Sequence, residues 1–281
     1  MMCFHPITLA SKQVVPCGNC IGCRINRTSA WTLRLLAEQT MWKDCAFVTL
    51  TYDDEHLPKN SSLVKADVQR FFKRLRKALG DRKIKYYCCG EYGEKKTHRP
   101  HYHAIIFGLS CSDSDRKLVA DCWKYCNRVK FTDRRCKGIA SVSKDSIQYV
   151  AGYCQKKLTG VLGLEAYECT NRVPPFSLSS RGLGLEYFKT HDVFDENLTA
   201  TLWNGKHFLA PRYIRDKLGL ELSMNDKAVR YYEDLSEFLD KEQYHKACRL
   251  GLLSEIQRQL KEEDVENALR HYYAKNTIKR S

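Results

Sequence analysis

Two histidines separated by one residue, His101 and His103, stand inside a run that has the composition of a buried β-strand. Alternate residues of a strand point to the same face of a sheet, which places the two imidazoles about 6.6 Å apart along the backbone, at a rise of about 3.3 Å per residue. At this separation, two ring nitrogens can converge on one metal ion. The alternative is a pair of ordinary core or surface histidines, and the pair alone does not decide between them.

Glu91 is the candidate third ligand. It lies near the end of the preceding predicted strand, 84–92, and a hairpin loop over 93–100 joins this strand to the histidines. Pairing of the two strands places Glu91 on the histidine face, although Glu94 in the loop is a rival and a surface turn residue is the alternative. Two histidines and a carboxylate suit Mg²⁺ or Mn²⁺ acting as a Lewis acid, with Zn²⁺ as the other candidate.

A second pair of residues, Tyr149 and Tyr153, lies one turn apart on a predicted helix, 145–158, and Lys156 and Lys157 continue their stripe. A tyrosine hydroxyl becomes a nucleophile when it loses its proton, but its ordinary pKa near 10 requires help from a metal, a base or a lysine. Attack on a DNA phosphodiester would free a 3′-hydroxyl and leave a 5′-phosphotyrosine bond. A second tyrosine would permit a second transfer. Two tyrosines at this spacing are also typical of an ordinary amphipathic helix.

The chain is strongly basic. Its 281 residues include 47 Lys and Arg against 33 Asp and Glu, a formal net charge of +14. Such a charge favours a polyanionic partner, with nucleic acid first and a membrane surface second. Basic residues concentrate on the predicted helix 68–79, where we expect phosphate contacts; a face that only keeps the helix solvated is the alternative. The expected DNA-binding residues are Arg70, Lys73, Arg74 and Lys77.

A cluster of cysteines, Cys17, Cys20 and Cys23, lies near the N-terminus. With Cys3 or His5 as a fourth ligand, these thiols could hold a structural Zn²⁺. The spacing departs from the usual two-plus-two pattern, and free thiols in a tight loop are the alternative. Either interpretation keeps this cluster outside the active site.

The chain lacks the sequence features of a membrane or secreted protein. No apolar run reaches the ~18 residues that span a bilayer, and the first residues do not form a signal peptide. We therefore expect a cytoplasmic protein with no membrane partner, whose 14 cysteines are reduced or metal-bound rather than paired in disulfides.

The predicted elements define an α+β fold. A helix crossover followed by a hairpin suits an antiparallel-rich central sheet with flanking helices. The N-terminal segment to about residue 25 is expected to be irregular, and 172–176 is expected to be a loop or linker. The expected strands are 46–52, 84–92, 101–109 and 138–142, and the expected helices are 28–43, 68–79, 115–126 and 145–158, with two or three charged helices over 226–275.

Taken together, these motifs resemble those of HUH endonucleases: the strand 47–52, the His-hydrophobic-His pair and the Tyr-x-x-x-Tyr helix. Four runs, 16–24, 89–93, 99–103 and 149–153, resemble more closely the replication initiators of gokushovirus-type microviruses, which are small single-stranded DNA phages. The resemblance covers about residues 16–160. Its motifs are specific in combination rather than singly.

The resemblance implies an HUH nuclease with an RRM-like core over 45–165, preceded by a Cys-rich segment and helix over 1–44 and followed by a linker and helical region over 166–281. It implies rolling-circle replication in the cytoplasm of a bacterial host, by nicking single-stranded origin DNA and joining the 5′ end covalently to the protein. In the family, the metal lies on the two histidines and a nearby acidic or polar residue. A host helicase is a candidate partner.

Two other classes of protein fit the same residues. A non-catalytic, zinc-containing DNA-binding protein would bind DNA in a strongly salt-dependent way without metal-dependent cleavage. An HUH relaxase or transposase would share the chemistry and act on plasmid or mobile DNA. Only the DNA substrate separates this last class from a replication initiator.

Overall fold

The computed structural model describes residues 7–12, 14–19, 21–93, 98–135, 138–156, 163–195, 198–203 and 206–221. The chain divides into two units, Arg27–Glu221 and a second made of Met1–Asn26 with Leu222–Ser281. In the second unit, strands β1 (Ile7–Thr8) and β2 (Val14–Val15) pair antiparallel. The helices expected over 226–275 lie outside the described residues.

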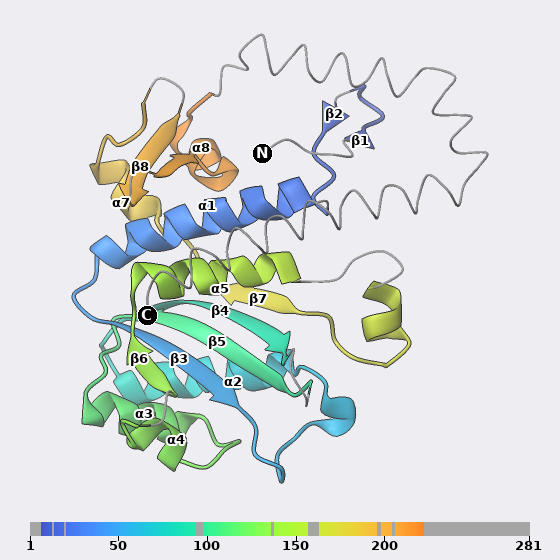
Figure 1. The fold of residues 1–281 in the computed structure, drawn as a ribbon. Helices are drawn as coiled ribbons and strands as arrows, with labels where there is room; N and C mark the ends of the chain where they lie inside the picture. Colours follow the sequence, from blue (N-terminus) through green and yellow to red (C-terminus); the bar gives the residue numbers. More distant parts are fainter. Residues whose placement is uncertain are drawn as a thin grey trace. The chain divides into compact units, whose positions relative to one another are not determined.

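A five-stranded antiparallel sheet forms the centre of the Arg27–Glu221 unit (Figure 1). The strand order is β6-β3-β5-β4-β7, and every pairing is antiparallel. The expected α+β class with an antiparallel sheet is confirmed. The strands are β3 (Cys45–Thr51), β4 (Lys85–Tyr92), β5 (Pro100–Phe107), β6 (Ile139–Ser141) and β7 (Phe176–Ser179).

Helices cover both faces of this sheet (Figure 1). Helix α2 (Lys65–Leu79) packs on one face with α3 (Asp113–Cys122) and α4 (Val129–Thr132), while α5 (Lys144–Lys156) lies on the other with α1 (Ile21–Thr40). Each helix has one apolar side for this purpose. In α2, the buried residues recur at helical spacing and the basic residues occupy the opposite side. The buried hydrophobic residues of α2 are Val68, Phe71, Phe72 and Leu75.

The sequence misplaced both ends of α1. The helix was expected over 28–43, but it begins at Ile21 and ends at Thr40, so the expectation of irregular structure up to residue 25 is wrong for 21–25. The apolar periodicity that indicated the helix starts only at Trp31, because its first turns carry few apolar residues. At the other end, Trp42 continues the apolar pattern without being helical, since its indole packs against the core and donates a 2.7 Å hydrogen bond to Glu38.

The elements after residue 160 were not predicted as such. Strand β7 follows two prolines, and its side chains are partly exposed, so it has no buried run that would mark a strand. The remaining elements pack beside α1, and their apolar residues Phe188, Ala200 and Ile214 join its core. These elements are the π-helix η2 (Leu164–Glu168), α7 (Leu185–Thr190), β8 (Thr199–Trp203), β9 (Lys206–Leu209) and α8 (Arg212–Leu218). A short 3₁₀-helix, η1 (Lys59–Ser61), precedes α2.

Among the described helices, none combines the length and the apolar character needed to cross a bilayer.

Candidate metal and nucleophile site

Strand register brings Glu91, His101 and His103 to one face of the sheet. Glu91 in β4 pairs directly with His101 in β5, and His103 lies two residues further along β5. Because side chains alternate along a strand, all three point to the face that α5 covers. The hairpin β4–β5 therefore positions the carboxylate beside the histidines, as the sequence predicted for Glu91. Glu94, the rival ligand, lies outside the described residues.

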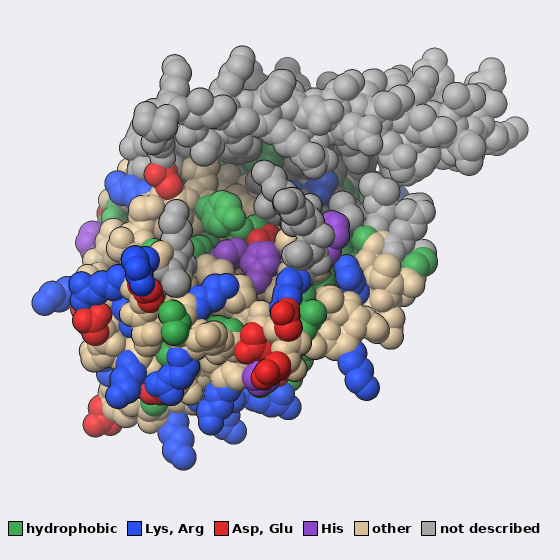
Figure 2. Space-filling view, turned by 60° about the horizontal axis from the view of Figure 1, so that its bottom comes forward, with side chains coloured by type: hydrophobic (Ala, Val, Ile, Leu, Met, Phe, Trp, Pro, Cys, Tyr) green, Lys and Arg blue, Asp and Glu red, His purple; other side chains and the backbone are tan. Residues whose placement is uncertain are grey.

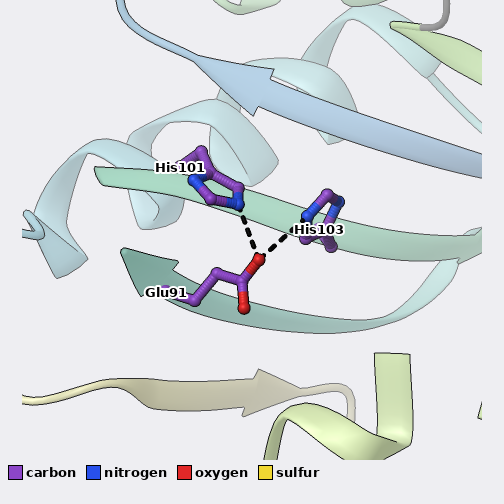
Figure 3. Close-up of side chains that lie close together, drawn as sticks. All are labelled: Glu91, His101 and His103. Carbon is purple, nitrogen blue, oxygen red and sulfur yellow. Dashed lines mark hydrogen bonds and ion pairs between the residues drawn. The ribbon is translucent and has the colours of Figure 1, made fainter. Parts of the chain in front are cut away.

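The ligand atoms of the three residues converge (Figure 3). Glu91 Oε1 lies 2.6 Å from His101 Nε2 and 3.3 Å from His103 Nε2. One ligand atom from each residue can be chosen so that all three lie within 4.8 Å of one another, the only such cluster of at least three metal-ligating residues in the described part of the chain. Glu91 and His103 are buried and His101 is half-buried. This geometry is that of a candidate metal-binding triad.

The outer nitrogens of both imidazoles are held by neighbouring groups. His101 Nδ1 donates to the carbonyl oxygen of Arg99 at 3.2 Å, and His103 Nδ1 hydrogen bonds with Thr49 Oγ1 at 3.1 Å. Metal-bound histidines usually have such a partner on the second nitrogen, because it fixes the ring and its tautomer. Both rings are thereby oriented with Nε2 toward Glu91.

The donor set fits a divalent cation. Two imidazole nitrogens and one carboxylate oxygen form a mixed set that leaves coordination positions open for water or substrate oxygens. Histidine next to a carboxylate accepts Mn²⁺, Mg²⁺ or Zn²⁺, and the three side chains alone do not distinguish these ions.

Both tyrosines of α5 lie against His103. The Tyr153 ring stacks on the His103 ring, with centroids 5.1 Å apart, and the Tyr149 ring meets it edge-on at 5.8 Å. The two tyrosine rings also contact each other at 4.8 Å. On the side of α5 that packs on the sheet, the apolar residues are fully buried, and this packing turns the tyrosine stripe toward the candidate metal site. These apolar residues are Ile147, Val150 and Ala151.

The two tyrosines differ in their surroundings. Tyr149 is 53% exposed, whereas Tyr153 is only 4% exposed. Burial raises the pKa of the Tyr153 hydroxyl above its ordinary value, and a hydrogen bond with Tyr149 and the negative charge of Glu91 raise it further. Tyr153 therefore holds its proton more tightly than a tyrosine in water.

The surface that carries the histidines is mixed in charge. Figure 2 shows histidine side chains together near the middle of this view, with acidic side chains beside them and lysine and arginine side chains spread below. Of the two predicted catalytic lysines, Lys156 is the last residue of α5 but its side chain is not described, and Lys157 lies outside the described residues.

The basic residues predicted to bind DNA lie away from the triad. Arg70, Lys73, Arg74 and Lys77 belong to α2, which covers the opposite face of the sheet. Two of them already have partners within the fold: Arg70 pairs with Asp67 at 3.1 Å, and Arg74 donates to the carbonyl of Cys122 at 2.8 Å. A phosphate contact by these residues remains a prediction.

The cysteine cluster is partly described. The Sγ atoms of Cys17 and Cys23 lie 4.0 Å apart, and the amide of Asn19 donates to Cys17 Sγ at 3.4 Å. Cys3 and Cys20 lie outside the described residues, so the zinc site stays a prediction.

Thr49 is the site residue that the sequence did not single out. It pairs with His103 across β3 and β5, and its hydroxyl holds the imidazole. Polar residues at alternate positions, Thr49 and Thr51, interrupt an otherwise apolar strand and would have indicated a polar patch on this face.

Comparison with known proteins assigns the chain to a family. Residues 45–158 match the family model of replication-associated proteins of the ORF2 type. The chain is 33% identical over 223 residues to replication-associated protein ORF2 of Spiroplasma virus 4, and 39% identical over 215 residues to replication-associated protein VP4 of Bdellovibrio phage phiMH2K. It is 30% identical over 237 residues to replication-associated protein ORF4 of Chlamydia phage 1.

These alignments cover 74%, 72% and 80% of this chain and 68%, 66% and 59% of the respective relatives. No solved structure matches the chain. The chain belongs to this family of phage replication-associated proteins, which confirms the resemblance seen in the sequence.

Proposed function

We propose that this protein initiates rolling-circle replication by nicking single-stranded origin DNA and joining the new 5′ end to a tyrosine. The observation that carries the proposal is the contact of two tyrosine rings, Tyr149 and Tyr153, with His103 of the triad. A candidate metal site and two candidate nucleophiles thus share one imidazole. Membership in a family of phage replication-associated proteins supplies the biological setting.

The chemistry is transfer of a phosphodiester to tyrosine. The tyrosine oxygen attacks phosphorus, the bond to the 3′ oxygen breaks, and that oxygen leaves as a 3′-hydroxyl after it gains a proton. The phosphotyrosine keeps one phosphodiester bond for the one broken, so a 3′-hydroxyl can later attack it and rejoin a strand without ATP. A divalent ion on Glu91, His101 and His103 would supply Lewis-acid polarisation of the phosphate.

The surroundings of the tyrosines suggest that they have different roles. Tyr149 is accessible to a DNA strand and can release its proton to water, whereas Tyr153 is buried and has a raised pKa. We therefore expect Tyr149 to make the first attack and Tyr153 to serve a second transfer. A second tyrosine allows the first DNA end to remain attached while the second is cut.

The test uses single-stranded oligonucleotides that tile the genome encoding this chain, incubated with the full chain and Mn²⁺. A covalent adduct is detected as a labelled band that survives denaturing gel electrophoresis. We expect an adduct with the wild type, a large loss in Tyr149→Phe, a smaller loss in Tyr153→Phe and none in the double variant. Tyr187→Phe, in α7 outside the site, is the matched control.

Two outcomes would contradict the proposal. An adduct that still forms in the double variant would exclude these tyrosines as nucleophiles. Salt-dependent DNA binding by the wild type without any metal-dependent cleavage would favour the non-catalytic alternative.

A further inference from the structure

A lysine from outside the sequence motifs reaches the triad face of the sheet. Lys130 Nζ donates a 2.7 Å hydrogen bond to Thr51 Oγ1. Thr51 is the last residue of β3 and pairs directly with His101 in β5, so their side chains lie on the same face. Directly paired residues of antiparallel strands have Cβ atoms about 4.5–5.5 Å apart. The Lys130 ammonium is therefore one side chain away from a candidate metal ligand.

The backbone that carries Lys130 is firmly held. Its neighbour Phe131 is fully buried, and the Phe131 carbonyl accepts a 3.2 Å hydrogen bond from the buried Arg116. On the other side, the Lys130 carbonyl lies against Gly138, where an added Cβ would be only 2.2 Å away. These contacts fix α4 at the end of the sheet where β3 and β6 begin to separate. The lysine is thus positioned rather than merely present on the surface.

The groups around the Lys130 ammonium leave it largely uncompensated. Its hydrogen-bond partner is a neutral hydroxyl, and the ion pairs of the described residues do not include it. Burial raises the pKa of the neighbouring Cys126 thiol to about 11, so this thiol is neutral near pH 7. Asp53 also acts on Cys126, but its carboxylate is engaged by His56 at 2.6 Å.

An ammonium has three N–H donors, and Thr51 uses one of them. A half-buried cation that lacks an anionic partner is costly unless a ligand supplies one. A DNA phosphate next to the metal site has the required charge and acceptor oxygens.

We propose that Lys130 binds a phosphate of single-stranded DNA on the β3 side of the triad, and that Thr51 is the positioning residue that holds its ammonium there. The inference rests on the proposed function and names one of its substrate contacts. It also moves the expected phosphate contacts from α2, on the far face, to the face that carries the histidines.

The test is salt-dependent binding of a 5′-fluorescein-labelled 30-nucleotide thymidine oligonucleotide, measured by anisotropy without added divalent ions. Each phosphate contact on a single strand contributes about 0.7 to the slope of log K against log salt. We expect Lys130→Gln to lower that slope by about 0.7 and to weaken binding about 3- to 10-fold at low salt. Lys130→Arg should retain the wild-type slope because it keeps the charge.

Lys117→Gln is the matched control, because Lys117 is exposed on α3 and its replacement removes the same charge elsewhere. A slope and affinity for Lys130→Gln equal to those of Lys117→Gln would overturn the inference. If Lys130→Gln melts at a lower temperature than the wild type, Lys130→Met repeats the test with the aliphatic part of the side chain retained. Thr51→Val should weaken binding less than Lys130→Gln, since it frees the ammonium without removing it.

The binding assay requires no cleavage, so it separates this inference from the proposed function. Absence of a covalent adduct in the wild type would contradict the nicking proposal, while a lowered slope in Lys130→Gln would still support the phosphate contact. An adduct together with an unchanged slope would reject the Lys130 contact alone.

Discussion

The two faces of the central sheet are built by the same strands, but their polar groups are used differently. On the face under α2, Tyr52, Asp67 and Tyr102 form a buried network: the Tyr52 hydroxyl lies 2.9 Å from Asp67 and 3.0 Å from Tyr102. On the face under α5, the polar residues of the triad converge at the end of the sheet that carries the β4–β5 loop. The first network closes on itself, whereas the second presents donor atoms to a ligand.

Adjacent residues of β5 illustrate the difference. The Tyr102 hydroxyl accepts a 2.7 Å hydrogen bond from the Val64 amide and lies 3.2 Å from the Val64 carbonyl, which ties β5 to the start of α2. Burial raises the pKa of Tyr102 to about 12, so it stays neutral. His103, the next residue, points to the other face and keeps Nε2 toward Glu91. Strand alternation therefore separates a structural residue from a candidate ligand within two positions.

The largest effect is expected from removing both imidazoles. In His101→Gln/His103→Gln, Mn²⁺ binding should be lost and adduct formation should fall by on the order of 10³-fold, because a bound ion contributes several kcal/mol of charge stabilisation. Isothermal titration measures the first quantity and a quantitative gel assay the second. His191→Gln, on an exposed residue outside the site, should change neither. Wild-type adduct formation by the double variant would show that this face does not carry the chemistry.

A smaller effect is expected from Thr49→Val, which keeps the shape of the side chain but removes the hydroxyl that hydrogen bonds with His103 Nδ1. Loss of such a supporting partner typically costs about 10- to 100-fold in metal affinity. Mn²⁺ titration checks the change, with Thr132→Val, at an exposed position of α4, as control. An affinity equal to that of the control variant would mean that Thr49 does not orient the ring.

On the opposite face, Tyr102→Phe should affect stability rather than activity. The substitution removes a hydrogen-bond partner from the buried Tyr52 hydroxyl and from the Val64 amide, which typically costs about 1–3 kcal/mol in the free energy of unfolding. Urea unfolding measures this loss, and the folded variant should form the adduct at the wild-type rate. Tyr149→Phe is the complementary control, expected to lose activity with little change in stability because Tyr149 is exposed. The reverse pattern would reject the division between the two faces.

Local patterns were sufficient to predict most of the sheet and the ligands on it. The histidine spacing and the hairpin that follows Glu91 placed all three triad residues on one face, because strand alternation and hairpin pairing are local. The tyrosine stripe on α5 was equally readable from its helical spacing. The position of that stripe against His103 depends on the packing of α5 on the sheet, which only the structure gives.

Contacts between distant segments were not predictable. Lys130 is 79 residues from Thr51 in sequence, and nothing in its own surroundings marks it as part of the site. The basic helix α2 was the more obvious candidate for DNA contacts, yet it packs on the other face of the sheet. Charge density along the sequence reports the sign of a surface, but the order of strands and helices decides which charges share a face with the ligands.

Gly152 gives the smallest effect and the sharpest distinction between stability and function. It occupies the interior of α5, between the two tyrosines, and an added Cβ would meet nothing within 4 Å. By contrast, a Cβ on Gly90 would come 3.0 Å from Tyr102, and Gly80 has a positive φ of 60°. The packing and backbone conformation that explain those glycines therefore do not explain Gly152.

A side chain on a helix leans toward the preceding turn, so a residue at position 152 would cover surface next to Tyr149. If a DNA strand approaches Tyr149 over the bare backbone, Gly152→Ala should slow adduct formation severalfold. It should also raise the free energy of unfolding by about 0.5–1 kcal/mol, since alanine favours a helix interior over glycine. Gln148→Ala, on the neighbouring turn, controls for helix stabilisation alone. A more stable Gly152→Ala variant with an unchanged rate would mean that the strand reaches the tyrosine by another path, because a defect in folding cannot account for a slower reaction in a more stable protein.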